Sequence, residues 1–282
     1  MIRTAFAFCL LCTISYAQVA QDSLVSFWGF TEGIGIVAHD SSGQNHTGTI
    51  HGATWSYGLT SYAIQLTDST DYVQADSTAA YSNFSDALTF SLWFEPNKYG
   101  GGRLLDKWTD SLEDKALSID SNLSVSFYLA GVMKPGTPLI SNSQLSLNQW
   151  SHITATYDGT TAKLYINGVM DNALGCSGTI GNGSGALFLG NNHERVAPGG
   201  IANGVSGTVA NVRIYRIALS ASDVDTVFNK DGGTLATSSS SSSSSSSCGS
   251  CGTGTGLALI PPLWFKVRSR RKAKHKNKNS EA

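Results

Sequence analysis

Two tight turns within a run of alternating residues set the strongest limit on how this chain can fold. In residues 152–157, apolar or aromatic positions alternate with polar ones, which places successive side chains on opposite faces of a strand. Asp158-Gly159 and Asn167-Gly168 end two successive strands, and both dipeptides favour the positive φ of a two-residue hairpin turn. The sequence therefore predicts three antiparallel strands across residues 150–175.

The same alternation recurs elsewhere between residues 18 and 233. Residues 88–94 predict another strand, with the large apolar side chains on one face. The members of that face are Leu88, Phe90, Leu92 and Phe94. Glycine is frequent and proline is rare, with 30 and 6 residues in the chain, and sustained helical periodicity is missing. We therefore expect an all-β domain.

One helical turn is predicted near the end of this region. Ser220-Ala221-Ser222-Asp223 has the form of a capping box, in which the first and last side chains satisfy each other's backbone N–H groups. Val224, Val227 and Phe228 follow at helical spacing. We expect this apolar stripe to pack against the domain.

The first 17 residues have the composition of a targeting segment. Arg3 supplies a positive charge, residues 5–14 form a short apolar run, and Ser15-Tyr16-Ala17 offers small residues at the expected cleavage position. A membrane span needs about 20 apolar residues, so this run is too short for one. Residues 1–17 therefore predict a signal peptide, cleaved after Ala17, and a secreted protein.

The region after residue 233 has two parts. Residues 234–247 include ten consecutive serines, which cannot bury apolar surface and predict a flexible linker. Residues 248–282 begin with Cys248 and Cys251, continue through a short apolar stretch and end in a basic cluster. This order resembles the three-part C-terminal sorting signals of bacteria. The resemblance implies processing at one of these cysteines, display at the bacterial envelope, and contact with the membrane only through this tail.

The body between the two ends is acidic, although the whole chain has a net charge of −1. Between the signal peptide and the basic tail there are ten lysines and arginines against nineteen aspartates and glutamates, a net charge of −9. A surface of this sign repels the phosphates of nucleic acids, so we expect no nucleic-acid partner. It is compatible with calcium ions and with neutral ligands such as sugars.

Four segments resemble one known family. The first contains Trp28-Gly29-Phe30-Thr31-Glu32-Gly33 and then Asp40-Ser41-Ser42-Gly43, and the others are residues 90–96, 150–168 and 207–220. In this order they resemble the LamG-like jelly-roll family of concanavalin A-like domains. The resemblance covers about residues 24–229 and implies a jelly-roll sandwich of two antiparallel sheets. Because this architecture carries lectins, adhesion modules and glycosidases, function has to be argued from the site.

The acidic residues do not have the pattern of a glycosidase. Glycosidases need two carboxylates flanking the scissile bond, and those of this fold usually present them as Glu-x-Asp-x-x-Glu along one strand. No such run occurs in the sequence. The nearest acidic cluster lies in a loop-like segment and consists of Asp106, Asp110, Glu113 and Asp114. We therefore expect a protein that is not an enzyme.

Calcium is the ion that an acidic extracellular surface suits best, because it prefers oxygen ligands. Pentraxins share the jelly roll and bind calcium between two loops. That resemblance implies a site built from Glu113, Asp114, Asn192 and Glu194. Asp40, with Glu32, is a further candidate. The alternative is that all of these are solvated loop charges.

Aromatic side chains in loop-like surroundings are candidates for stacking on sugar rings. Trp108, Tyr99 and Trp55 meet this description, whereas Trp28, Trp93 and Trp150 lie in fold-defining strands and are expected to pack in the core or between the sheets. His193 and Arg195 lie in a glycine-rich loop, residues 191–204, and join Trp108 and Tyr99 as predicted ligand-binding residues.

Together these observations predict a secreted or surface-displayed, non-catalytic module that binds carbohydrate or glycoprotein. The alternative is a structural or adhesive surface protein that binds another protein. A glycosidase of the concanavalin A-like fold is the third possibility.

Overall fold

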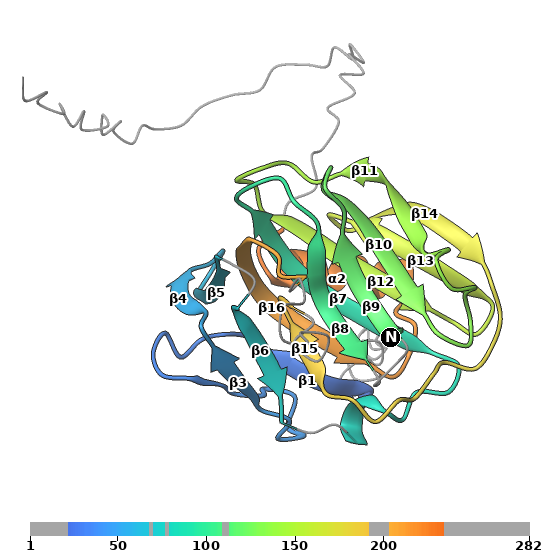
Figure 1. Cartoon of the computed structure of the whole chain (residues 1–282), viewed down its shortest axis with the longest axis horizontal. Coiled ribbons are helices and arrows are strands. Elements are labelled where there is room, and N and C mark those ends of the chain that lie inside the picture. Colours follow the sequence, from blue (N-terminus) through green and yellow to red (C-terminus); the bar gives the residue numbers. More distant parts are fainter. Residues whose placement is uncertain (1–21, 68–69, 77–78, 109–112, 192–202, 234–282) are drawn as a thin grey trace, which may run out of the picture. The chain divides into compact units, whose positions relative to one another are not determined.

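A computed structural model describes residues 22–67, 70–76, 79–108, 113–191 and 203–233. The predicted signal peptide, linker and sorting tail lie outside the described residues. In the part that is described, two antiparallel sheets pack face to face, as the sequence predicts (Figure 1). None of the described helices is long and apolar enough to cross a membrane.

Sheet A contains the strands that the sequence predicts. Among the described residues its spatial order is β14 (Val169–Gly175), β13 (Thr161–Ile166), β12 (Ser151–Tyr157), β7 (Leu88–Pro96), β16 (Gly207–Tyr215), β5 (Tyr62–Leu66) and β4 (Thr54–Tyr57). The strand β1 (Leu24–Trp28) also pairs with β16, beside the half of β16 that β5 leaves open. The predicted hairpins on either side of β13 are confirmed, and Asn167 and Gly168 have the expected positive φ.

Sheet B forms the second layer. Its spatial order, again among the described residues, is β11 (Leu139–Gln144), β10 (Ser124–Leu129), β9 (Glu113–Ile119), β8 (Gly102–Trp108), β15 (Leu187–Leu189), β6 (Tyr72–Ala75), β3 (Gly48–His51) and β2 (Val37–Ala38). A short 3₁₀ helix, η1 (Ala79–Tyr81), precedes β7. The strands β8, β9 and β10 follow one another as a meander, so they are neighbours in both sequence and space.

The main core lies between the sheets. The predicted face of β7, formed by Leu88, Phe90, Leu92 and Phe94, is buried there. Phe90 meets Phe127 of sheet B edge-on, with ring centroids 6.3 Å apart. Trp28 is also buried in this core, and its indole N–H donates to the carbonyl of His46. The shared apolar face predicted for residues 88–94 and the core position predicted for Trp28 are therefore confirmed.

The outer face of sheet A is covered by the helix α2 (Ala221–Lys230). The predicted capping box is present, since Ser220 Oγ accepts from the N–H of Asp223 and the Ser220 N–H donates to the Asp223 carboxylate. The helix extends well beyond the single turn predicted. Phe228 stacks on Trp93 at 5.5 Å, and Asp231 pairs with Arg213 through two hydrogen bonds of 2.5 and 2.8 Å.

This helix changes the expected place of two tryptophans. Trp93 is buried between sheet A and α2, and Trp150 is half-buried against the same cluster, so neither belongs to the inter-sheet core. The polar side of β12 is buried as well, where His152 Nε2 lies 2.9 Å from Ser91 Oγ. Burial, helped by the charge of Arg213, lowers the pKa of His152 to about 3.

Candidate ligand-binding groove

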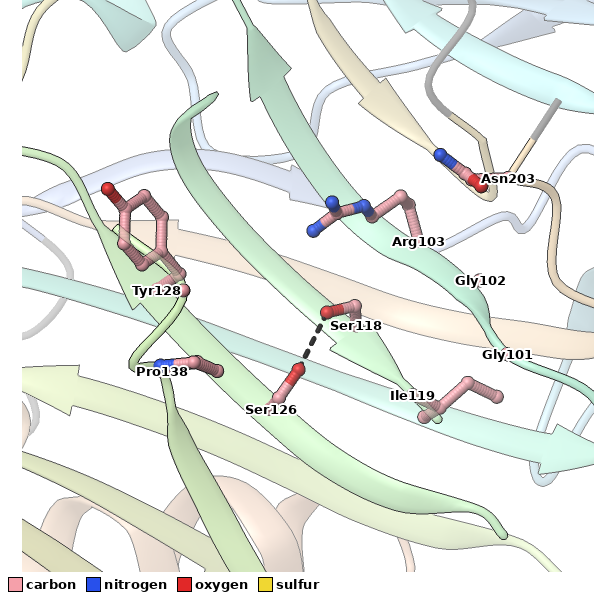
Figure 2. Close-up of a pocket in the computed structure, with 10 residues that line it drawn as sticks. Gly101, Gly102, Arg103, Ser118, Ile119, Ser126, Tyr128, Pro138 and Asn203 are labelled. Carbon is pink, nitrogen blue, oxygen red and sulfur yellow. Dashed lines mark hydrogen bonds between the residues drawn. The ribbon is translucent and has the colours of Figure 1, made fainter. Parts of the chain in front are cut away.

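A groove of about 470 Å³ lies on the outer face of sheet B, over β8, β9 and β10 (Figure 2). A volume of this size is in the range of small-ligand sites. Its described lining consists of Gly101, Gly102, Arg103, Ser118, Ile119, Ser126, Tyr128, Gly136, Pro138 and Asn203.

Strand register places three polar side chains of the groove in one row. Arg103 on β8 is opposite Ser118 on β9, and Ser118 is opposite Ser126 on β10. The two serine hydroxyls are hydrogen-bonded to each other at 2.8 Å. All three residues are half-buried. The row therefore offers a guanidinium and two hydroxyls along the floor of the groove.

The next row adds an aromatic wall. Tyr128 on β10 is opposite Ala116 on β9, and Ala116 is opposite Asp106 on β8. Ala116 is fully buried in this row. Figure 2 shows the Arg103 side chain extending from its strand toward Tyr128. The ring and the guanidinium thus face the same space.

At one wall of the groove, the backbone at Gly102 lies close to the backbone at Gly204. A Cβ atom on Gly102 would lie 2.7 Å from the carbonyl carbon of Gly204, so only glycine leaves room for the chain there. The Arg103 N–H donates to the carbonyl of Asn203 at 2.8 Å, which fixes Asn203 at the edge of the groove. On the opposite side, Gly136 and Pro138 come from the connection between β10 and β11.

The lining suits a polar, neutral or negatively charged ligand. Arg103 is the only charged side chain among the described lining residues. Serine, tyrosine and asparagine supply hydrogen-bond donors and acceptors, and the tyrosine ring supplies an apolar surface. The described lining contains no carboxylate that could act as an acid or base in glycoside hydrolysis.

The predicted ligand-binding residues lie elsewhere or outside the described residues. Tyr99 is 68% exposed between β7 and β8 and is not part of the described lining. Trp108 ends β8, where its backbone pairs with Glu113. His193 and Arg195 lie outside the described residues. Trp55 is half-buried, and its indole N–H donates to the carbonyl of Gly35 at 2.8 Å.

The predicted calcium ligand Asp114 lies in a buried ion cluster rather than in a solvated loop. Its carboxylate is 2.8 Å from the ammonium of Lys115 and 3.5 Å from that of Lys107, and both lysines are fully buried. The Gly183 N–H donates to the same carboxylate at 3.0 Å. Burial lowers the pKa of Lys115 to about 8, which Asp114 partly opposes. Two adjacent ammonium groups disfavour a divalent cation at this carboxylate.

The other predicted calcium ligand, Asp40, organises a loop. Its two oxygens accept hydrogen bonds from the N–H groups of Phe27, Ser42 and His46 and from the Ser42 hydroxyl, at 2.7 to 2.9 Å. Glu32 accepts from the N–H of His39. These bonds explain why an Asp-x-Ser-Gly sequence occurs there.

Calcium binding stays a prediction. Asn192 and Glu194 lie outside the described residues, and nothing is described of the Glu113 side chain. The described residues include no group of three or more His, Cys, Asp or Glu side chains placed to hold a metal ion.

A family model described as the concanavalin A-like lectin/glucanases superfamily, Laminin_G_3, matches residues 67–225. The chain belongs to this superfamily. No curated protein sequence matches the chain. Because the superfamily name covers both lectins and glucanases, membership alone does not decide between binding and catalysis.

Solved structures show the same fold in binding domains. The binding domain of Paraclostridial Mosquitocidal Protein 1 has 20% identity and a TM-score of 0.58, over 75% of this chain and 53% of that one. Domain 4 of a GH43 extracellular arabinanase from Geobacillus stearothermophilus, solved with arabinotriose, has 19% identity and a TM-score of 0.56, over 73% and 98%. Botulinum neurotoxin type C, whose cell entry depends on two ganglioside molecules, has 17% identity and a TM-score of 0.60, over 76% and 53%. This superfamily member thus spans about half the length of the two toxin chains.

Sequence reasoning missed the residues of the groove. The available signal was the alternation in residues 124–129, which leaves Ser126 and Tyr128 on the side opposite Val125 and Phe127. A tyrosine that follows two serines on the outward side predicts an aromatic side chain on the outer face of the sheet. The partner strand that brings Arg103 beside it was not evident from that pattern.

Proposed function

We propose that this member of the concanavalin A-like superfamily is a non-catalytic carbohydrate-binding module, with its glycan ligand in the groove over β8, β9 and β10. The observation that carries this proposal is the combination of the Tyr128 ring with the polar row of Arg103, Ser118 and Ser126 in one groove. Sugars need both an apolar surface for their C–H faces and hydrogen-bonding groups for their hydroxyls.

The similarity to domains solved with arabinotriose or dependent on gangliosides supports a sugar ligand. The lack of carboxylates in the described lining supports binding without turnover. A purified protein that hydrolyses any polysaccharide would instead favour a glycosidase.

A glycan array with and without calcium tests the proposal. We expect the unmodified protein to bind a defined set of glycans and Tyr128→Ala to lose most of that signal. Tyr57→Ala is the matched control, because Tyr57 is an exposed tyrosine of sheet A and is not part of the groove. Loss of binding in Tyr57→Ala, with binding retained in Tyr128→Ala, would contradict this location.

A second candidate function is attachment to another protein. Ile34, Ile36 and Tyr57 are 80%, 66% and 82% exposed, and Tyr57 stacks on Tyr62 at 5.6 Å. The Trp55 indole N–H donates to the carbonyl of Gly35, which ties the segment of Ile34 and Ile36 to the strand of Tyr57. Exposed apolar side chains that lie close together often mark interaction surfaces. A silent glycan array, together with cell aggregation that Tyr57→Ala abolishes, would favour this function.

Secretion and display at a bacterial envelope also belong to the proposal. The sequence features of residues 1–17 and 248–282 support cleavage after Ala17 and processing at Cys248 or Cys251. Intact-mass measurement on protein from the native host tests this. A mature chain that still ends at Ala282 would exclude processing of the tail.

A further inference from the structure

The two ends of sheet A differ in how their end strands are protected, and this difference indicates a partner. We propose that β4 (Thr54–Tyr57) pairs antiparallel with β4 of a second copy of this chain, so that sheet A continues from one copy into the next. The inference rests on the second candidate function, attachment to another protein, and is independent of the groove on sheet B.

The protected end lies where β14 and β11, the end strands of the two sheets, meet. The Asp171 carboxylate of β14 accepts hydrogen bonds from the N–H groups of Asn142 and Ser143 in β11, at 2.5 and 3.0 Å. The Asn172 side chain donates to the carbonyl of Ile140 at 2.7 Å. Side chains of one end strand thus bind the backbone of the other, and Asp171 adds a charge of the kind that discourages pairing with another chain.

The unprotected end lies at β4, the last strand in the described order of sheet A (Figure 1). Its partner β5 lies along one side of it. Residues 41–67, which include both strands, contain no Asp, Glu, Lys, Arg or Pro. Charged residues and proline are the usual means by which proteins keep an edge strand from pairing with another chain. The sequence of β4 therefore lacks the protection that Asp171 gives to β14.

Hydrogen-bond alternation shows which backbone groups face the edge of β4. The Gly58 N–H donates to the carbonyl of Ser61 at 2.8 Å across the hairpin turn, and the next pair along the strands is Tyr57 opposite Tyr62. Hydrogen-bonded and non-hydrogen-bonded pairs alternate along antiparallel strands, so Tyr57 and Trp55 form non-hydrogen-bonded pairs with β5. Their N–H and C=O groups therefore point away from β5, toward the edge.

A two-fold axis at Ser56 makes this edge complementary to itself. Residues that lie opposite each other in a sheet point to the same face, so a symmetric pairing can place Ser56 opposite Ser56 of the second copy and Trp55 opposite Tyr57. Both Trp55–Tyr57 pairs then exchange their outward N–H···O bonds. A slide of about two residues in either direction keeps the faces but leaves one outward-facing residue of β4 without a partner in the other β4.

The side chains beside this edge are apolar or aromatic. The Trp55 indole N–H donates to the carbonyl of Gly35, which places the exposed Ile34 and Ile36 next to β4. Tyr57 is also exposed, and it lies on the same face of the strand as Trp55. The pairing places Tyr57 of the second copy beside Trp55, so it removes part of this apolar surface from water.

Charge favours contact through this face over the rest of the surface. The body has a net charge of −9, so two copies repel each other wherever their charged faces approach. The nearby carboxylate of Glu32 is bonded to the N–H of His39. The uncharged hairpin lets two copies meet with less repulsion. Because a strand of four residues makes a small contact, we expect a weak dimer in solution, strengthened by avidity when many copies are displayed together.

A disulfide trap tests the register. In Ser56→Cys the two thiols lie on opposed residues with Cα atoms about 4.5 Å apart, within reach of a disulfide. Thr54→Cys is the matched control on the same face of β4, because the two residues at position 54 are at least about 13 Å apart in this register. Both variants are made in the full-length protein with its other cysteines replaced by serine, and are oxidised with diamide. We expect covalent dimer from Ser56→Cys and little from Thr54→Cys, measured by non-reducing gel and intact mass.

Sedimentation of the full-length protein measures the association itself. Tyr57→Pro removes an outward N–H without loss of a hydrogen bond to β5, whereas Tyr57→Ala keeps that N–H, so the proline variant should weaken the dimer more. The unmodified protein should associate more tightly at about 500 mM salt than at about 50 mM, because salt screens the repulsion between two acidic bodies. A contact made by ion pairs would weaken instead, which would contradict the uncharged interface.

The outcomes separate self-pairing from the function on which it rests. Equal yields of covalent dimer from Ser56→Cys and Thr54→Cys overturn the register, and a protein that sediments as a monomer with no dimer from either variant overturns self-pairing. In those cases, cell aggregation that Tyr57→Ala abolishes still supports attachment, with a different protein as partner. If aggregation is also missing, the second candidate function fails, and the glycan array decides the groove separately.

Discussion

The outer faces of the two sheets differ in how far other parts of the chain cover them. On sheet A, α2 covers the central strands, so β7 and β12 are buried on both sides and the polar residues of β12 lie in a hydrogen-bonded layer. On sheet B, β10 alternates between buried and half-buried positions, and its outer side chains line the groove. The helix thus covers the outer side of the central strands of sheet A, whereas the outer side of β10 is half-buried and lines the groove. Substitutions on the two faces should therefore have different effects.

Removal of the helix contact should have the largest effect. Phe228 is 2% exposed and packs on Trp93 and His152. Phe228→Ala should lower the free energy of unfolding by about 3–5 kcal/mol, because it leaves a cavity between α2 and sheet A. Urea denaturation measures this. An unchanged midpoint would show that α2 contributes little to the fold.

Acid should act on the covered face through His152. Its pKa is lowered to about 3 in the fold, whereas an unfolded histidine has a pKa of about 6.5. Between these values the unfolded state binds a proton that the folded state does not, so stability is fully present above pH 6.5 and falls as the pH drops toward 3. We expect a loss of about 2–4 kcal/mol from this group.

The matched variant for that experiment is His152→Gln. It removes the titrating ring but keeps a polar group near Ser91, so the decline in melting temperature between pH 6.5 and 4.5 should become shallower. An identical decline in both proteins would assign the acid sensitivity to other groups.

Trp150 should have an intermediate effect. A tryptophan of the inter-sheet core would be expected to cost about 3–5 kcal/mol on truncation. Because Trp150 is only half-buried at the edge of the cluster under α2, Trp150→Ala should cost about 1–2 kcal/mol. A loss as large as that of Phe228→Ala, measured by the same urea titration, would place it in the core after all.

The groove face should be the most tolerant. Tyr128→Ala removes a half-buried ring from the outer side of sheet B and should change stability by less than about 1 kcal/mol. This variant is expected to lose ligand binding while it keeps its melting temperature. A large destabilisation would mean that the Tyr128 ring supports the fold.

Local patterns explain what the sequence could predict. The strands on either side of Asp158-Gly159 and the capping box at Ser220 depend on neighbouring residues alone, so alternation and turn chemistry are sufficient to find them. Their faces could be assigned for the same reason. What they could not show was that α2 folds back over sheet A and buries the second face as well.

The groove could not be predicted from the sequence, because it depends on a shift in strand register that no local sequence pattern reveals. In a regular strand, Arg103, Leu105 and Lys107 would point to the same side. A register shift between Arg103 and Leu105 places Arg103 on the outer face, while Leu105 and Lys107 point inward. The same geometry brings Lys107 to Asp114, which is why an acidic segment that looked solvated forms a buried ion cluster.

The pairing of β1 with β16 bears on the order in which the domain can assemble. Leu24 lies opposite Tyr215, and β16 also joins β7 to β5, so the last of the described strands in the sequence takes a central position in sheet A. Until that strand emerges, β1 has no partner in sheet A, and the β4–β5 pair stays separate from the strands β7, β12, β13 and β14. Such long-range pairing slows folding. A chain that reaches its final compartment before β16 inserts would therefore still be unfolded when it arrives.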